Sequence, residues 1–191
     1  MDITVLVTNY NYSRYLRRCI RSLLSQHYPR DKFEIIVVDD ASTDDSVSRL
    51  TDYVDAGEIR LLKNKRNLGI GSSANIGVSH AGGKYIVRVD SDDYVQPEFL
   101  MVLFAACKHT NAIGATVDYR LVSDDDENLG MECWKDKKIA CGLMMKTSYL
   151  ESIGSYTRNI RLHEDRDLFS RVDFSRIVHI PIPLYNYVKH S

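Results

Sequence analysis

The stretch Tyr85-Ile-Val-Arg-Val-Asp90-Ser-Asp92-Asp93 joins an apolar β-strand to three carboxylates at its end. A nearly unbroken run of apolar, mostly β-branched residues is typical of a strand buried in a parallel sheet. Carboxylates crowded at a strand end repel each other unless a cation or a strong donor lies among them. Magnesium and manganese bind oxygen ligands, and a metal that bridges two phosphates needs only one or two carboxylates from the protein. The stretch therefore predicts a divalent metal and a phosphorylated ligand, with an exposed acidic turn as the alternative.

The bulk properties are those of an ordinary globular domain. The chain has 191 residues, of which 44% are hydrophobic and 27% charged, and this suits one domain with a proper core. A net charge of -1 gives no support for a nucleic-acid partner. The longest apolar run, residues 99–107, is too short to cross a bilayer, so we expect neither a transmembrane segment nor a signal peptide. The scattered cysteines, without a CxxC pair, favour a cytoplasmic location, at most peripheral to the inner face of a membrane.

Strand-like and helix-like segments alternate over the first 110 residues. We expect strands over residues 3–8, 33–38, 58–62 and 84–89, and helices over residues 16–24, 42–54, 72–81 and 97–108. Such repeats predict a mostly parallel sheet with helices on both faces. Ligands of these sheets bind beyond the carboxyl ends of the strands. The polar clusters at residues 8–11, 39–40 and 90–93 should therefore meet at one edge.

The second part of the chain is less regular. We expect strands over residues 112–119 and 139–145, and a short helix after His163-Glu164-Asp165. The acidic run at residues 123–128 is interpreted as a solvated loop rather than a metal site. No linker or repeat indicates a second domain, so residues 1–191 are expected to form one domain.

Several motifs in a fixed order resemble the family 2 glycosyltransferases of the GT-A fold, and the similarity covers nearly the whole chain. The motifs are Val5-Leu-Val-Thr8-Asn-Tyr10-Asn11, Val37-Val-Asp39-Asp40-Ala-Ser42-Thr-Asp44, Asn67-Leu-Gly69, Asn75-Ile-Gly77, Ala81-Gly-Gly83-Lys-Tyr85-Ile86, Val89-Asp90-Ser-Asp92-Asp93 and His163-Glu164-Asp165. The resemblance implies an α/β GT-A fold, a Rossmann-like and mostly parallel sheet flanked by helices, with a less regular carboxyl-terminal acceptor side. Residues 1–110 would then bind the nucleotide sugar, and residues 111–191 would supply the acceptor side and the catalytic base.

The resemblance also implies an activity, which is the inverting transfer of a sugar from a nucleoside diphosphate donor. We expect a UDP-sugar as the donor and a saccharide or lipid-linked saccharide as the acceptor. The residues assigned to nucleotide binding are Thr8, Tyr10, Asn11, Asp39, Asp40, Asn67, Gly69, Asn75, Asp90 and Ser91. A tyrosine ring can stack on a pyrimidine, and a threonine hydroxyl can hydrogen-bond its edge. Asp40 matches the aspartate that accepts a hydrogen bond from the base, and Asp39 is expected to orient the loop or reach the ribose, with a capping role for the pair as the alternative.

The family pattern assigns the metal and the general base as well. Asp92 is the expected contact to Mn²⁺ or Mg²⁺, with Asp90 and His190 as further candidates. Asp165 matches the general base that takes a proton from the acceptor hydroxyl, a role in which burial and neighbours adjust the pKa of a carboxylate. Glu164 and Asp93 are candidates for acceptor binding or accessory roles. Helix-start electrostatics is the alternative for the acidic pair at residues 164–165.

The sequence departs from the family pattern at Ala74, where many relatives carry an arginine, so Lys65 or Arg66 would have to replace that diphosphate contact. A related domain that binds a sugar nucleotide or a protein without turnover is one alternative function. A sugar nucleotidyltransferase is another, but it should carry a Gly-rich basic loop where residues 8–13 have neither glycine nor lysine. Gly69-Ile-Gly71-Ser-Ser-Ala74 matches a dinucleotide fingerprint, although it follows the third expected strand instead of the first.

Overall fold

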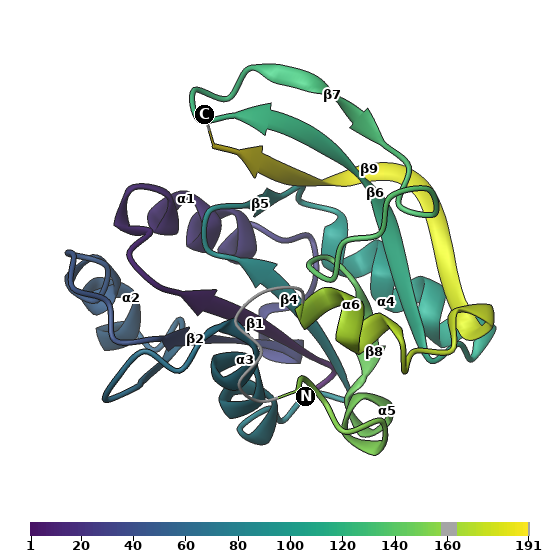
Figure 1. Ribbon diagram of the computed structural model, residues 1–191, viewed down its shortest axis with the longest axis horizontal. Helices are drawn as coiled ribbons and strands as arrows, with labels where there is room; N and C mark the ends of the chain where they lie inside the picture. The colour runs from purple at the N-terminus through teal and green to yellow at the C-terminus, as the bar shows by residue number, and fades with distance from the viewer. Residues whose placement is uncertain (158–163, 191) are drawn as a thin grey trace.

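A computed structural model of the chain describes residues 1–157 and 164–190, the side chain of Glu164 excepted. Within these residues one sheet of nine strands has the order β3-β2-β1-β4-β8-β6-β9-β5, and β7 pairs with β6 (Figure 1). Its parallel part consists of β1 (Ile3–Asn9), β2 (Phe33–Asp39), β3 (Arg60–Lys63) and β4 (Tyr85–Asp90). This confirms the expected α/β fold with a mostly parallel sheet flanked by helices.

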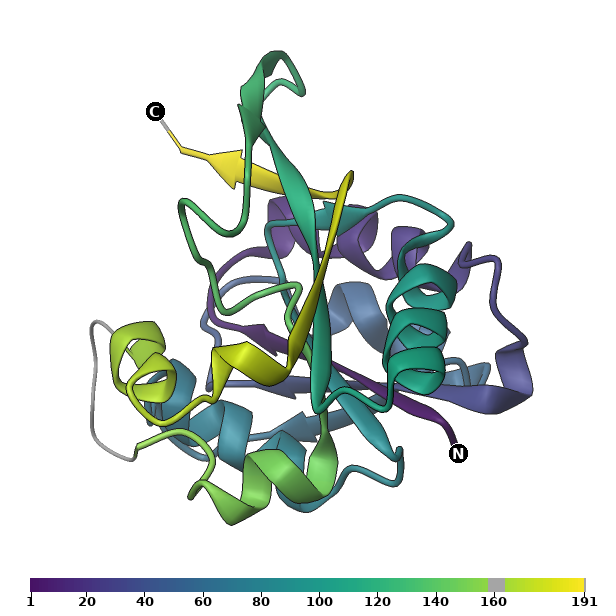
Figure 2. The same ribbon diagram turned by 90° about the vertical axis from the view of Figure 1, so that its right-hand side faces the viewer.

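Helices cover both faces of the parallel strands. The helices α1 (Ser13–Leu24) and α4 (Phe99–Thr110) lie on one face, where Phe104 contacts Tyr85 of β4 with ring centroids 5.7 Å apart. The other face carries α3 (Ile70–Ser79), α5 (Thr147–Ser152) and α6 (Glu164–Phe169), so α4 and α6 stand on opposite sides in Figure 2. A Cβ atom at Gly77 would lie 2.1 Å from Leu6 Cδ1. The glycine therefore permits the close approach of α3 to β1.

The carboxyl-terminal half extends the same sheet. It contributes β5 (Tyr94–Val95), β6 (Gly114–Ser123), β7 (Asn128–Glu132), β8 (Met144–Lys146) and β9 (Ile177–Lys189). The strand β8 runs antiparallel to β4, and β9 runs parallel to β6. The β6–β9 register shifts on both sides of Asp118, where β9 carries Pro181 and Pro183. Prolines are tolerated in a strand at such irregularities because they cannot donate to the ladder.

Three expectations differ from the structure. A helix starting at Ser42 is wrong, because residues 43–47 form bends and turns. They are followed by a 3₁₀ turn, η2 (Ser48–Leu50), and the short helix α2 (Thr51–Asp55). The Ser42 hydroxyl donates to Asp39 Oδ1 at 2.6 Å and so stabilises a turn. The strand expected over residues 139–145 is shorter and shifted: β8 spans Met144–Lys146, because residues 140–142 form a turn in which Gly142 has a φ of +77°. The strands β5, β7 and β9 were not predicted, since they are short, exposed or interrupted by proline.

Candidate active site

A cavity of about 330 Å³ opens at the carboxyl ends of β1 and β4 and at the start of α3. The cavity is lined by Thr8, Asn9, Tyr10, Tyr12, Asp40, Asn67, Gly69, Ile70, Ser73, Asp90, Ser91 and Asp92. The sheet register explains this convergence, because Thr8 pairs with Val38 on one side and with Asp90 on the other. The volume falls in the range of small-molecule sites, which is about 300–1,000 Å³. Most of the predicted nucleotide-binding residues thus line one cavity.

Asp40 lines the cavity and holds the loop that precedes α3. It is 4% exposed, and its carboxylate accepts hydrogen bonds from Asn64 Nδ2 (2.8 Å), Leu68 N (2.9 Å) and Gly69 N (2.8 Å). Gly69 has a φ of +84°, which glycine adopts without a steric penalty, and α3 begins at the next residue. The amino terminus of α3 therefore faces the cavity, and its dipole favours an anion there.

Asp39 and Asn11 do not line the cavity; they hold the loop at residues 41–44. Asp39 accepts from Asn9 Nδ2 at 2.9 Å and from Ser42 N at 3.0 Å. Asn11 Oδ1 accepts from Thr43 N at 2.8 Å. Their hydrogen bonds fix the turn next to Tyr10. Tyr10 lines the cavity and is 43% exposed.

Asn75 lies outside the cavity, contrary to the position expected for a nucleotide contact. Its Nδ2 donates to Tyr156 O at 2.6 Å, and its Oδ1 accepts from Tyr156 N at 2.9 Å. The side-chain amide is thus used to fix the chain after α5. Ala74 is fully buried, whereas Lys65 and Arg66 are exposed on the loop before α3.

His190 lies against Asp92 at the cavity edge. Its Nε2 is 2.7 Å from Asp92 Oδ2, and its Nδ1 is 2.8 Å from Asp124 Oδ1. Asp124 also accepts a hydrogen bond of 2.6 Å from the Tyr15 hydroxyl. Burial lowers the pKa of His190, but the hydrogen bonds to both carboxylates outweigh it and raise the pKa. The β6–β7 loop is therefore not simply solvated, because it helps to place His190.

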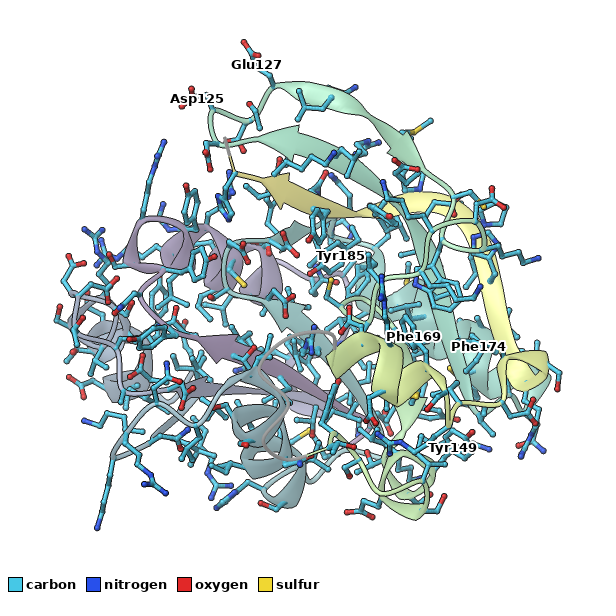
Figure 3. The ribbon with its side chains drawn as sticks, in the orientation of Figure 1. Asp125, Glu127, Tyr149, Phe169, Phe174 and Tyr185 are labelled. Carbon is cyan, nitrogen blue, oxygen red and sulfur yellow. The ribbon has the colours of Figure 1, made fainter. Side chains whose placement is uncertain are left out.

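The rest of the β6–β7 loop divides into a bound part and a solvated tip. Asp126 pairs with Arg18 of α1. The side chain of Asp125 is 86% exposed, and Asp125 and Glu127 point outward at the top of Figure 3. The expectation of a solvated acidic loop therefore holds for the tip alone.

Asp90, Asp92 and His190 are residue types that suit a divalent cation, but His190 Nε2 and Asp92 Oδ2 lie 2.7 Å apart, a hydrogen-bond distance, so the two would share one ion only after this contact opens. Carboxylate oxygens suit magnesium and manganese, and a neutral imidazole is a common metal ligand. Burial first, and then the Asp92 and Asp90 carboxylates, raise the pKa of Tyr12 beside them. This edge of the cavity therefore carries a negative potential that a cation would relieve.

Asp93 points away from the cavity and anchors β9. It is 1% exposed and accepts hydrogen bonds from the Tyr185 hydroxyl (2.6 Å) and from Val188 N (2.8 Å). Burial, followed by the charges of Asp92 and Asp90, raises the pKa of Asp93 well above its usual range. Tyr185 is itself 1% exposed, and it is labelled near the middle of the view in Figure 3. Asp93 thus anchors β9, the strand that leads to His190, and its buried carboxylate is not open to an acceptor.

Asp165 lies in α6 on the opposite face of the sheet from α4. Its Oδ1 is 3.4 Å from Arg88 Nη2, and its Oδ2 accepts from Ala140 N at 3.3 Å. Its side chain is 33% exposed, so it is partly open to solvent. Of its predicted companions, His163 and the side chain of Glu164 lie outside the described residues.

Aromatic packing docks α6 onto the domain. Leu168 is fully buried. The Phe169 ring lies 5.5 Å from Phe174 and 6.4 Å from Trp134, centroid to centroid, and Figure 3 shows the two phenylalanines side by side. Aromatic pairs at such distances contribute beyond their buried area. The position of Asp165 is therefore set by a packed helix.

Arg88 is a functional candidate that the motif comparison missed. Its side chain is 3% exposed, and its Nε lies 2.9 Å from Asp90 Oδ1. A signal was present in the sequence, because Arg88 interrupts an apolar strand and lies two residues before Asp90, on the same face. A buried arginine requires partners, so an arginine in this strand predicts a carboxylate beside it.

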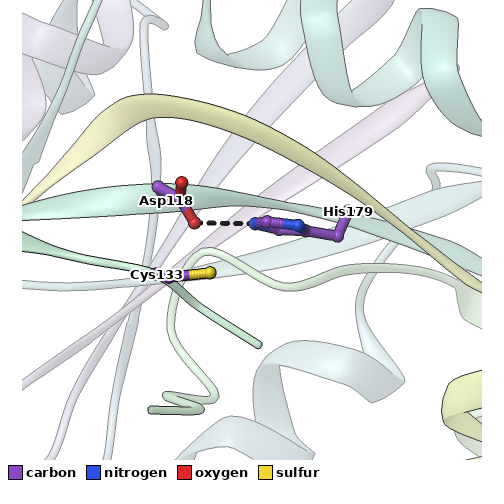
Figure 4. Close-up of side chains that lie close together, drawn as sticks. All are labelled: Asp118, Cys133 and His179. Carbon is purple, nitrogen blue, oxygen red and sulfur yellow. Dashed lines mark hydrogen bonds and ion pairs between the residues drawn. The ribbon is translucent and has the colours of Figure 1, made fainter. Parts of the chain in front are cut away.

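A second polar cluster, formed by Asp118, Cys133 and His179, lies away from the cavity (Figure 4). Asp118 Oδ1 lies 2.6 Å from His179 Nε2 and accepts from Trp134 N at 2.9 Å. Two ligands of one tetrahedral zinc ion stand about 3.3 Å apart, which follows from metal–ligand bonds of about 2.0 Å. The Asp118–His179 contact is therefore a hydrogen bond that braces β6, β9 and the segment after β7.

Comparison with known proteins identifies the family. The model of "Glycosyl transferase family 2" matches residues 4–162. The chain belongs to glycosyltransferase family 2. This family 2 glycosyltransferase is 34% identical over 101 residues to the poly(ribitol-phosphate) beta-N-acetylglucosaminyltransferase TarS of Staphylococcus aureus, an alignment that covers 52% of this chain and 18% of TarS. It is 33% identical over 131 residues to the chondroitin synthase of Escherichia coli, covering 64% of this chain and 19% of that protein.

Solved structures agree with the GT-A fold. The structure of S. aureus TarS 1-349 in complex with UDP-GlcNAc superposes with a TM-score of 0.87 at 21% identity, covering 100% of this chain and 59% of that one. The mannosyltransferase PcManGT from Pyrobaculum calidifontis in complex with GDP-Man and Mn²⁺ gives 0.76 at 19% identity, covering 98% and 56%. The chain spans less than half the length of the curated relatives that it matches. Among the described residues, no helix has the length and apolarity that a bilayer crossing requires.

Proposed function

We propose that this glycosyltransferase is metal-dependent and inverting, and that it transfers a sugar from a UDP-sugar to a hydroxyl of a saccharide or lipid-linked saccharide. One observation carries the proposal: Arg88 contacts both Asp90 at the donor cavity and Asp165 on α6. A carboxylate that can accept a proton thus stands next to the edge where the donor diphosphate would lie. Residues 1–110 would bind the donor, and residues 111–191 would supply the base and the acceptor side.

The donor assignment rests on the cavity and on the relatives together. Tyr10 and Thr8 stand at the mouth and on the wall of the cavity, where a base can stack and hydrogen-bond. Asn67 and Gly69 border the amino terminus of α3, which favours phosphate. TarS is described in complex with UDP-GlcNAc, whereas PcManGT holds GDP-Man. The pyrimidine is our choice because the TarS complex with UDP-GlcNAc superposes with the higher TM-score, 0.87 against 0.76 for PcManGT.

The proposed reaction is a single displacement at the anomeric carbon. The acceptor oxygen forms a bond to this carbon from one side while the bond to the diphosphate oxygen breaks on the other. The proton of the acceptor hydroxyl passes to Asp165, and the nucleoside diphosphate leaves with the electron pair of the broken bond. Attack and departure on opposite sides invert the configuration.

Asp92, with Asp90 and His190, would hold Mn²⁺ or Mg²⁺. When bound, the cation supplies charge neutralisation for the departing diphosphate. The protein itself contributes the fixed positions of these three side chains, because Asp124 orients His190 and Arg88 orients Asp90.

The other functions have weaker support. A domain without turnover would have no need to tie Asp165 to the cavity edge. A sugar nucleotidyltransferase would need basic groups after β1, where Tyr10 and Asn11 stand instead. A cytoplasmic location, with at most peripheral contact at the inner face of a membrane, remains a prediction.

A donor screen tests the proposal. The chain would be incubated with UDP-, GDP- and dTDP-sugars, with Mn²⁺, Mg²⁺ or EDTA, and the released nucleoside diphosphate would be measured with and without saccharide acceptors. We expect release from a UDP-sugar with Mn²⁺ or Mg²⁺ and none with EDTA. Full turnover by both Asp92→Ala and Asp165→Ala on a verified donor would overturn the proposed mechanism.

A further inference from the structure

Arg88 is buried in a closely fitted environment below the donor cavity. It lines a small void of about 10 Å³ together with Leu6, Val78, Leu143 and Tyr156 among others. The guanidinium carbon is 5.5 Å from the centre of the Tyr156 ring. Because Asn75 fixes the backbone of Tyr156 with two hydrogen bonds, this ring is itself held in place. The arginine therefore has little freedom to move.

The guanidinium contacts two carboxylates that come from distant parts of the chain. Arg88 Nε is 2.9 Å from Asp90 Oδ1. Arg88 Nη2 is 3.5 Å from Asp90 Oδ2 and 3.4 Å from Asp165 Oδ1. The planar guanidinium can address two acceptors at fixed angles, which a lysine ammonium cannot do.

Because the positive charge of Arg88 is buried, its interactions with Asp90 and Asp165 are strong. An arginine side chain that is 3% exposed has lost most of its hydration, and its carboxylate partners offset the cost of this loss. Burial lowers the pKa of Arg88, yet Asp90, Asp165 and other neighbours raise it well above its ordinary value. The charged arginine thus attracts the Asp165 carboxylate toward the sheet, while Ala140 N–H holds its other oxygen.

We propose that Arg88 is a positioning residue that sets the distance between the general base Asp165 and the donor edge at Asp90. This inference rests on the proposed function of Asp165. The Arg88 guanidinium holds Asp165 at a fixed distance from β4, whose end borders the donor cavity. The acceptor hydroxyl then loses its proton to Asp165 at a place from which its oxygen can reach the anomeric carbon. Arg88 itself is not expected to touch either substrate; Asp90 is its fixed anchor on β4, and Asp165 is the group through which it acts.

Variants of Arg88 test this role through kcat and donor affinity. Arg88→Met removes both ion pairs and keeps most of the apolar stem, and Arg88→Lys keeps the charge but not the fork. We expect kcat for sugar transfer to fall about 100-fold in Arg88→Met, since a misplacement of about 1 Å can cost that much. Arg88→Lys should recover about tenfold of this loss. The dissociation constant for UDP with Mn²⁺ should change less than about fivefold in both.

Arg171→Met is the matched control. Arg171 also pairs with an aspartate, at 2.6 Å from Asp167 Oδ2, and donates to the carbonyls of Ile153 and Ser155, but it does not line the cavity. Its loss should lower the melting temperature and leave kcat within about twofold. Wild-type kcat in a folded Arg88→Met variant would overturn the proposal. Failure of both Arg88 variants to fold would also overturn it, because Arg88 would then be a structural residue.

A double-mutant cycle separates this inference from the proposed function. If Arg88 acts through Asp165, then Arg88→Met should cost less than about threefold in an Asp165→Asn background, because groups that act as a unit are not additive. Multiplicative losses would overturn the inference while leaving Asp165 as the base. Full turnover by Asp165→Asn alone would instead refute the proposed function.

Discussion

The two halves of the domain place their functional residues by different means. In the first half, the cavity residues follow consecutive parallel strands, and Thr8 and Asp90 are direct register neighbours. In the second half, Asp165 and His190 reach the site through long-range contacts with Arg88, Asp92 and Asp124. The first arrangement is set by sheet topology, whereas the second depends on individual polar side chains. Mutations should therefore separate donor binding from proton transfer.

The largest effect is expected for the base. Asp165→Asn keeps the size of the side chain and removes the charge that accepts the proton, so kcat for transfer should fall about 10²- to 10⁴-fold. Steady-state kinetics with a verified donor and acceptor measure it. Asp167→Asn, two residues along α6, is the control, since this side chain binds Thr157 and Arg171 instead. Equal losses in both variants would indicate damage to α6 rather than loss of a base.

The next largest effect is expected at the metal edge. Asp92→Asn should lower kcat about 100-fold and raise the Mn²⁺ concentration needed for half-maximal activity, because the site loses a charged oxygen ligand. His190→Gln should give a smaller shift in the same direction. A Mn²⁺ titration of activity measures both, with Asp52→Asn as the control, since that carboxylate is 86% exposed. An unchanged Mn²⁺ requirement in Asp92→Asn would remove this residue from the metal site.

A moderate effect is expected for Asp40. In Asp40→Asn, one acceptor of the hydrogen bonds from Asn64, Leu68 and Gly69 becomes an amide donor, so the cavity wall should loosen. The affinity for UDP should weaken about tenfold, which corresponds to roughly 1.4 kcal/mol. Isothermal titration calorimetry measures this loss. Asp45→Asn is the control, and equal affinities of the two variants would contradict the assigned role.

The smallest effect on activity is expected at the brace in the second half. Asp118→Ala leaves His179 and the Trp134 N–H without their acceptor, which should cost about 1–3 kcal/mol of unfolding free energy. Activity at low temperature should stay within about twofold. Denaturant unfolding followed by the fluorescence of Trp134, the single tryptophan, measures the loss. The exposed Asp125→Ala should change stability by less than about 0.5 kcal/mol; a similar loss in both would show that the brace has no special role.

The contrast between the halves also explains what the sequence could reveal. Hydrophobic periodicity located the parallel strands, and their carboxyl ends then placed Asp40, Asp90 and Asp92 together. Asp39 holds its loop, which was one of its two expected roles, whereas Asn11 and Asn75 hydrogen-bond backbone groups instead of lining the cavity. Such contacts depend on loop conformations that periodicity does not encode.

The second half was less predictable because its residues interact over long distances in the sequence. The Asp124–His190–Asp92 contact joins a hairpin loop, the end of β9 and the end of β4. Its elements are short or contain proline, so they lack a clear periodic signal. Arg88 is the exception, because a charge within a buried strand is visible in the sequence and calls for partners.

Calorimetric titration of UDP with Mn²⁺ into Asp165→Asn and Asp40→Asn, side by side with wild type, tests the division between the halves most directly. We predict that Asp165→Asn binds UDP as tightly as wild type although its turnover is lost, while Asp40→Asn binds about tenfold more weakly. A loss of UDP affinity in Asp165→Asn as large as that in Asp40→Asn would contradict the account, because the base would then belong to the donor site.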